Sequence, residues 1–149
     1  MPKTNSRLYN RTSANQGSRA KRGVLIFLVE DDTLIIEVYK TALENAGFKV
    51  EAFTLGQDMV KCIEKIEAGD AKTPSLILLD IILPDIDGTQ VLEKIRQSAK
   101  TKEVPVFVFT NYINPELKKK CENLSIEKYI IKTNCPPSEL VKLVKEKLG

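Results

Sequence analysis

Asp80 directly follows the apolar run Leu76–Leu79 and precedes a turn that contains Pro84 and Gly88. An apolar run of this length is typical of a strand that is buried on both faces. An unpaired carboxylate within such a strand would be too costly to bury, so we expect Asp80 at the strand's carboxyl end. Ligands of open α/β sheets bind at that edge. The simpler alternative is an ordinary aspartate that ends a strand before a turn.

Other polar side chains follow apolar runs in the same way: Glu30, Asp31, Asp32, Thr110 and Lys132. The carboxyl ends of parallel strands meet at one edge, and adjacent strands are about 4.8 Å apart. Asp31 and Asp80 should therefore lie within several ångströms of each other. Crowded carboxylates repel one another unless a cation lies among them, and Mg²⁺ typically binds one or two carboxylates together with water and phosphate oxygens.

A lysine and a threonine hydroxyl beside such a cation add a positive charge and a neutral donor for phosphoryl oxygens. The set indicates phosphoryl transfer with an aspartate as the acceptor. The chain contains no histidine, which excludes Ser-His and Cys-His catalysis, a phosphohistidine carrier and a Cys/His zinc site. Its three cysteines form no CxxC pair, and we expect them to be reduced thiols in a cytoplasmic protein.

The periodicity of apolar residues predicts five strands that alternate with five helices. The expected strands are residues 24–29, 48–53, 75–80, 104–109 and 128–131. The expected helices are residues 32–46, 54–68, 87–98, 114–123 and 136–148. Thr54 and Gln57 have the spacing of a capping box for the second helix. The pattern favours an α/β fold, a flavodoxin-like (βα)5 doubly wound parallel sheet with strand order 2-1-3-4-5.

The charge of the chain is divided unevenly. Residues 1–22 contain six basic residues and no acidic one, which leaves 17 basic and 20 acidic residues, a net −3, in residues 23–149. The first segment has too few large apolar residues to offset the entropy of ordering, so we expect a basic disordered tail that touches nucleic acid weakly at most. Residues 23–149 are expected to form one domain. No apolar run approaches the roughly 20 residues of a membrane helix, so we do not expect the protein to bind a membrane.

Four motifs in order, at matching spacing, resemble the response-regulator receiver domain of two-component signalling across residues 23–149. They are Leu28-Val29-Glu30-Asp31-Asp32, Leu78-Leu79-Asp80-Ile81-Ile82-Leu83-Pro84-Asp85-Ile86-Asp87-Gly88, Phe109-Thr110 and Tyr129-Ile130-Ile131-Lys132. The resemblance implies that Asp80 is the phosphoacceptor. It also implies that Asp31 and Asp80 bind Mg²⁺ directly, that Glu30 helps through water, and that the backbone carbonyl of Ile82 is a further ligand.

The same resemblance implies that the Thr110 hydroxyl bonds the phosphoryl group and acts as the switch. Lys132 would neutralise a phosphoryl oxygen, and Tyr129 would be the aromatic residue that changes rotamer when Thr110 moves. Ile82 and Tyr112 would flank the path of the water that hydrolyses the acyl phosphate. An unpositioned water reacts slowly, so a long-lived phosphorylated state is expected.

The expected role is in signalling and not that of an enzyme, apart from intrinsic self-phosphotransfer and self-dephosphorylation. The phosphoryl group would come from a sensor histidine kinase or a phosphotransfer protein. The sequence ends after the fifth helix, so we expect a stand-alone receiver that docks to a separate target through its fourth helix, fifth strand and fifth helix. A homodimer is left open.

Two alternatives differ in chemistry. A receiver-like interaction module that no longer depends on phosphorylation would lack the acceptor Asp, the Thr or the Lys, and all three are present. An aspartyl-phosphate hydrolase of the haloacid-dehalogenase type needs a second acid two residues after the nucleophile, where this chain has Ile82.

Two positions depart from the family pattern. Asn111 stands where Thr110 is usually followed by a small residue, and its bulk is expected to narrow access to the acceptor. Thr133 stands where Lys132 is usually followed by a proline in a cis bond. A cis bond before another residue costs about 3 kcal/mol, so the sequence leaves the shape of this turn open.

Overall fold

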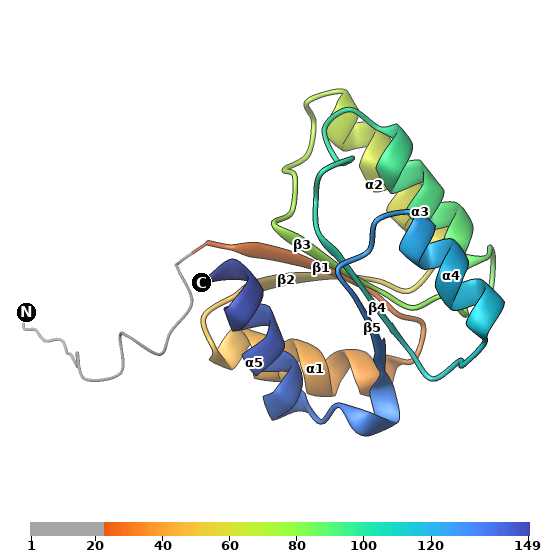
Figure 1. Ribbon diagram of the computed structural model, residues 1–149. Helices are drawn as coiled ribbons and strands as arrows, with labels where there is room; N and C mark the ends of the chain where they lie inside the picture. The colour runs from red at the N-terminus through yellow and green to blue at the C-terminus, as the bar shows by residue number, and fades with distance from the viewer. Residues whose placement is uncertain (1–22) are drawn as a thin grey trace, which may run out of the picture.

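The computed structural model describes residues 23–149, and the tail expected for residues 1–22 lies outside them. Five parallel strands form one sheet in the order β2-β1-β3-β4-β5. The strands are β1 (Leu25–Val29), β2 (Lys49–Phe53), β3 (Leu76–Leu79), β4 (Val106–Thr110) and β5 (Lys128–Ile131). The predicted flavodoxin-like fold and strand order are thus confirmed (Figure 1).

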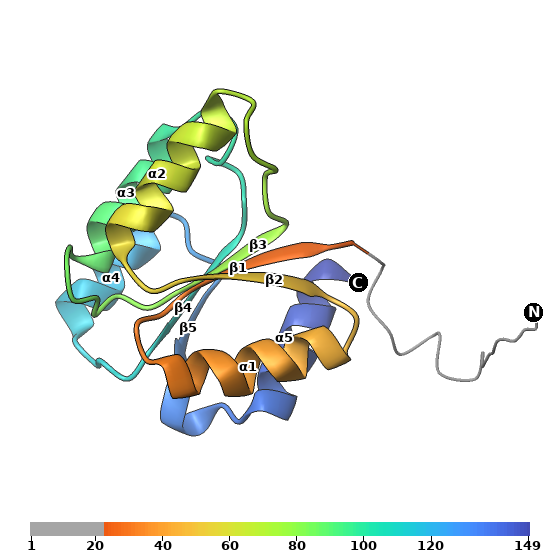
Figure 2. The same ribbon diagram turned by 180° about the vertical axis from the view of Figure 1, so that it is seen from behind.

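Five helices cover both faces of this sheet. They are α1 (Thr33–Asn45), α2 (Gly56–Glu67), α3 (Gly88–Gln97), α4 (Pro115–Asn123) and α5 (Pro137–Leu148). Figures 1 and 2 show α1 and α5 on one face and α2, α3 and α4 on the other. Along β1, Ile26 and Leu28 belong to the core under α1 and α5, whereas Phe27 and Val29 belong to the opposite core. The strand is apolar throughout because successive side chains enter different cores.

The capping box expected for the second helix is wrong. Helix α2 begins at Gly56, and the residue before it, Leu55, makes no side-chain capping bond. The first N–H groups of the helix instead donate to Asp85, at 2.9 Å from Gly56 N to Oδ1 and 2.8 Å from Gln57 N to Oδ2. A carboxylate from the distant β3–α3 loop satisfies the donors that a local cap would otherwise take.

The register of the sheet brings the polar strand ends to one edge. Val29 of β1 pairs with Leu79 of β3, so the residues that follow them, Glu30 and Asp80, are neighbours. The loop after Asp80 folds back tightly, because a Cβ on Gly88 would lie 2.6 Å from the Asp80 carbonyl oxygen. Within residues 23–149, the longest apolar stretches of helix fall short of what a membrane crossing requires.

Candidate functional site

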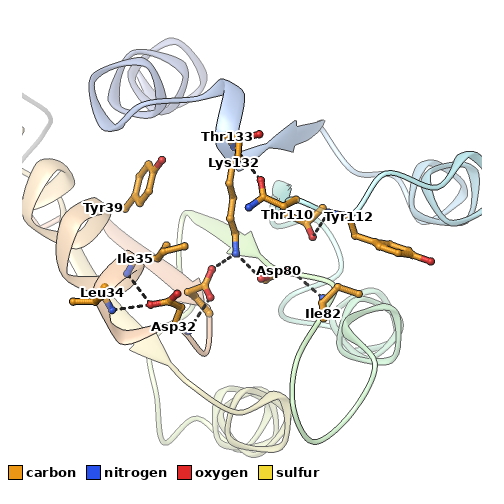
Figure 3. Close-up of polar contacts among 12 residues, drawn as sticks. Asp32, Leu34, Ile35, Tyr39, Asp80, Ile82, Thr110, Tyr112, Lys132 and Thr133 are labelled. Carbon is orange, nitrogen blue, oxygen red and sulfur yellow. Dashed lines mark hydrogen bonds and ion pairs between the residues drawn. The ribbon is translucent and has the colours of Figure 1, made fainter.

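Asp80 lies at the end of β3, with 6% of its surface exposed. Its Oδ1 accepts a hydrogen bond of 3.0 Å from the Ile82 N–H. Its Oδ2 lies 2.5 Å from the Nζ of Lys132, the residue that follows β5. Figure 3 shows the Lys132 side chain reaching across the edge of the sheet toward Asp80. The side chains that end β3 and β5 are therefore in direct contact, as the sequence predicts for polar residues at one edge of the sheet.

Glu30 is more deeply buried than Asp80, with 1% of its surface exposed. One of its oxygens forms an ion pair with Lys132, and the other accepts from the Asp32 N–H at 2.9 Å. Burial raises the pKa of Glu30, and the hydrogen bond from Lys132 opposes that rise. Burial by itself would lower the pKa of Lys132, but hydrogen bonds to Asp80 and Glu30 raise it above its ordinary value. The ammonium therefore stays charged between two carboxylates.

Asp31 completes an acidic cluster with Glu30 and Asp80. One carboxylate oxygen from each lies within 4.8 Å of the others, and Asp31 is the exposed member. Three oxygen ligands at this separation, open to water on one side, fit a hard divalent cation such as Mg²⁺. The Ile82 backbone, which follows two residues after Asp80, is also at this edge, as its N–H bond to Asp80 shows.

A cavity of about 450 Å³ opens over these groups. Its lining residues are Glu30, Asp31, Asp32, Ile35, Asp80, Ile82, Thr110, Asn111, Tyr112 and Lys132. The Thr110 hydroxyl accepts a 3.2 Å hydrogen bond from the Tyr112 N–H, which leaves its own hydrogen available to donate. Ile82 and Tyr112 are 53% and 44% exposed and flank the opening. The cavity can therefore accommodate a phosphoryl group on Asp80.

Tyr129 does not line this cavity but contacts Tyr112, which does. Its hydroxyl donates a 2.7 Å hydrogen bond to the carbonyl of Tyr112, and the Nζ of Lys118 lies 6.0 Å from its ring centre. Burial raises the pKa of Tyr129, so the hydroxyl remains a donor. Among the residues to which the sequence assigns a role in phosphorylation or metal binding, Tyr129 is the one that does not line the cavity, and its hydroxyl contacts the site through Tyr112.

Two contacts at this edge were not foreseen from the sequence. The Asn111 Oδ1 accepts from the Thr133 N–H at 2.9 Å, and the Asp85 carboxylate caps α2. The turn after β5 is a short 3₁₀ helix, η2 (Lys132–Asn134), and residues 23–149 contain no cis peptide bond. Each contact joins loops far apart in the sequence, so no local pattern of residue types signals it.

Comparison with known proteins places this geometry in a family. The chain matches the response regulator receiver domain over residues 26–145. It is 42% identical over 85 residues to the regulatory protein VanRc of Enterococcus gallinarum, covering 57% of this chain but only 33% of VanRc. The chain thus spans about a third of that relative's length.

Two solved structures extend the comparison to the fold. The phosphorylated cyanobacterial phytochrome response regulator RcpA is 32% identical, with a TM-score of 0.72 over 84% of this chain and 91% of the other. The Mn²⁺-bound form of response regulator Rcp1 is 27% identical, with a TM-score of 0.70 over 82% of this chain and 89% of the other. With the match over residues 26–145, these similarities show that the chain belongs to the response regulator receiver domain family.

Proposed function

We propose that this receiver domain accepts a phosphoryl group on Asp80 with the help of Mg²⁺. The observation that carries the proposal is the Lys132 ammonium, paired with both Asp80 and Glu30 beneath an open cavity. An Asp80 carboxylate oxygen attacks phosphorus and forms the acyl phosphate, while the bond from phosphorus to the donor's leaving group breaks.

The roles of the other residues follow from where they lie. Lys132 balances the negative charge of the phosphoryl oxygens, and the Thr110 hydroxyl donates to one of them. Asp31, Asp80, the Ile82 carbonyl and, through water, Glu30 would hold Mg²⁺. The bound metal would screen the charge that the phosphoryl group brings to this acidic edge. Support comes from the oxygen cluster itself and from the Mn²⁺-bound relative Rcp1.

The signal is proposed to leave through the face formed by α4, β5 and α5. The Tyr112 N–H donates a hydrogen bond to the Thr110 hydroxyl, and the Tyr129 hydroxyl on β5 donates one to the Tyr112 carbonyl. Movement of Thr110 toward a phosphoryl group would weaken the first bond and free Tyr112 to shift with Tyr129. The phosphoryl donor would be a histidine kinase or phosphotransfer protein, and the target a separate protein that docks on this face.

The alternative of an interaction module that does not depend on phosphate predicts a different site. Such a module has no need to keep an acceptor, a hydroxyl and a lysine together, yet Asp80, Thr110 and Lys132 line one cavity. The geometry therefore favours the phosphoacceptor.

The experiment that tests this function is incubation with a small-molecule phosphodonor such as acetyl phosphate, followed by intact mass. Wild-type protein should gain one phosphoryl group when Mg²⁺ is present and far less when a chelator removes it. Asp70→Asn, an exposed carboxylate outside the cavity, should behave as wild type. Equal labelling with and without Mg²⁺, or no labelling at all, would count against the proposal.

A further inference from the structure

The Asn111 carboxamide connects the two loops that flank the acceptor. Asn111 follows Thr110, the last residue of β4, and its Oδ1 accepts from the Thr133 N–H at 2.9 Å. Thr110 pairs with Ile131 of β5, so this bond crosses between the strands just beyond their last paired residues. The bond therefore links the residue after Thr110 to the residue after Lys132.

The turn that begins at Lys132 is held by hydrogen bonds to side chains outside it. The 3₁₀ helix η2 is a single turn, and Ile131, the residue before it, provides no side-chain cap. The first N–H groups of a helix have no partner within it, and short 3₁₀ turns have weak internal hydrogen bonds. Asn111 supplies an acceptor at the start of the turn, and the Tyr39 hydroxyl donates to the Cys135 carbonyl at its end, at 2.7 Å.

The direction of the Lys132 side chain follows from the position of this turn. A lysine side chain has four rotatable bonds, and fixing it costs about 2 kcal/mol of rotamer entropy. Its Nζ nevertheless contacts Glu30 and lies 2.5 Å from Asp80 while 9% of the residue is exposed. A displaced turn would carry the ammonium away from the acceptor.

We propose that Asn111 is a positioning residue that holds the η2 turn so that Lys132 points at the acceptor. This inference rests on the proposed function and deepens it. It differs from the expectation drawn from size alone, in which the bulk of Asn111 narrows access to Asp80. The two positions that depart from the family pattern, Asn111 and Thr133, are hydrogen-bonded to each other. This bond gives the Asn111 carboxamide a structural role that does not depend on its size.

Two substitutions separate the effect of the Thr133–Asn111 hydrogen bond, here called the tether, from the effect of the size of the Asn111 side chain. Asn111→Leu keeps nearly the same size and shape but cannot accept a hydrogen bond, whereas Asn111→Ala loses both features. Both variants should be phosphorylated about tenfold more slowly by acetyl phosphate with Mg²⁺, less than the roughly hundredfold that a 1 Å misplacement can cost. Asn111→Asp keeps an oxygen acceptor but adds a negative charge to a cavity that carboxylates already line, so it is tested by the hydrogen exchange of Thr133 and not by the rate. If Asn111→Ala instead accelerates phosphorylation while Asn111→Leu does not, bulk is the role and the proposal is wrong.

A double-mutant cycle tests whether Asn111 acts through Lys132. In a Lys132→Met background, adding Asn111→Leu should leave the slow phosphorylation rate unchanged, because the group that Asn111 positions is gone. Independent slowing of the same size as in wild type would show that Asn111 acts by another route and would overturn the proposal.

Hydrogen exchange gives a readout that does not depend on phosphorylation. The Thr133 amide should exchange faster in Asn111→Leu and Asn111→Ala than in wild type and Asn111→Asp, with amides of β1 unchanged. Equal Thr133 exchange in all four proteins would refute the tether. Failure of wild type to be phosphorylated, with the expected exchange pattern, would instead refute the proposed function and leave the tether standing.

Discussion

Among the residues that the structure describes, Asp31 differs from the other two carboxylates of the acidic cluster in having no ion pair. Within residues 23–149, Lys132 pairs with Glu30 and Asp80, and neither of the pairs at this edge includes Asp31. Its carboxylate lies close to the other two without a paired cation of its own among these residues, and it repels them.

This crowding leads to a prediction for Asp31→Ala. The variant should bind Mg²⁺ more than tenfold more weakly, since loss of even a second-shell partner typically costs 10- to 100-fold. Without metal it should unfold at a higher temperature than wild type, because repulsion is relieved. Titration calorimetry and thermal melts in chelator measure the two effects. A lower melting temperature would identify Asp31 as a structural partner instead.

Ile82 and Tyr112 lead to a prediction about the lifetime of the phosphorylated state. Both side chains line the cavity over Asp80, and Ile82 has no group that could orient an attacking water. Ile82→Asn supplies such a group and Tyr112→Ala removes cover, so either should speed dephosphorylation severalfold. The decay of the phosphoprotein mass after donor removal measures the rate.

Lys119→Ala, exposed on α4 and absent from the cavity lining, is the matched control and should decay as wild type does. Unchanged decay in both cavity variants, or loss of the wild-type signal within seconds, would contradict this account of the flanking positions.

The position of the acidic residues, but not all of their contacts, could be inferred from the sequence. Asp80 and Asp31 were placed by the rule that charges lie at the ends of buried strands, and the fold brings them together. The pairing of Lys132 with Glu30 as well as Asp80 depends on side-chain reach, which strand ends alone do not specify. The roles of these residues remain predictions.

At the scale of elements, the apolar periodicity located all five strands and all five helices, because buried faces repeat with the period of each element. The predicted range of β5 agrees with the structure, and every other predicted end lies within two residues of the observed one. The start of α2 was mispredicted because its cap comes from Asp85 in another loop. Caps formed across loops carry no local signal.

The Asp85 cap leads to a prediction about acid stability. The hydrogen bond from the Gln57 N–H, together with that from Gly56, holds the pKa of Asp85 below its ordinary value. A carboxylate whose pKa is lower in the folded than in the unfolded protein stabilises the fold at any pH above its unfolded pKa, about 3.9. This stabilisation is lost as the pH falls through the pKa of the folded state. Asp85→Asn should therefore lower Tm by a few degrees at pH 7.

The difference in Tm between wild type and Asp85→Asn should shrink as the pH falls below about 4. Thermal melts across this range measure it, with Asp70→Asn as the matched exposed carboxylate. A difference that stays constant with pH would mean that the charge of Asp85 does not contribute to the cap.

For the molecule as a whole, the sheet separates two cores and gathers the polar groups at one edge. Large apolar side chains hold each core, including Phe107 and Phe109 toward α1 and α5 and Met59 and Ile63 on the opposite side. Close-packed cores of this kind keep the strand ends in fixed register. The residues that we propose to move on phosphorylation lie along this edge: Thr110 ends β4, Tyr112 lies in the loop after it, and Tyr129 lies in β5.

The central claim, that Asp80 carries the phosphoryl group, is tested most directly by chemical mapping. Borohydride reduces an aspartyl phosphate to homoserine, which peptide mass spectrometry locates in the sequence. After treatment with acetyl phosphate and Mg²⁺, homoserine should appear at position 80 alone, and Asp80→Asn should yield none. Homoserine at position 31 or 85, or a phosphoryl group that resists reduction on a hydroxyl side chain, would contradict the account.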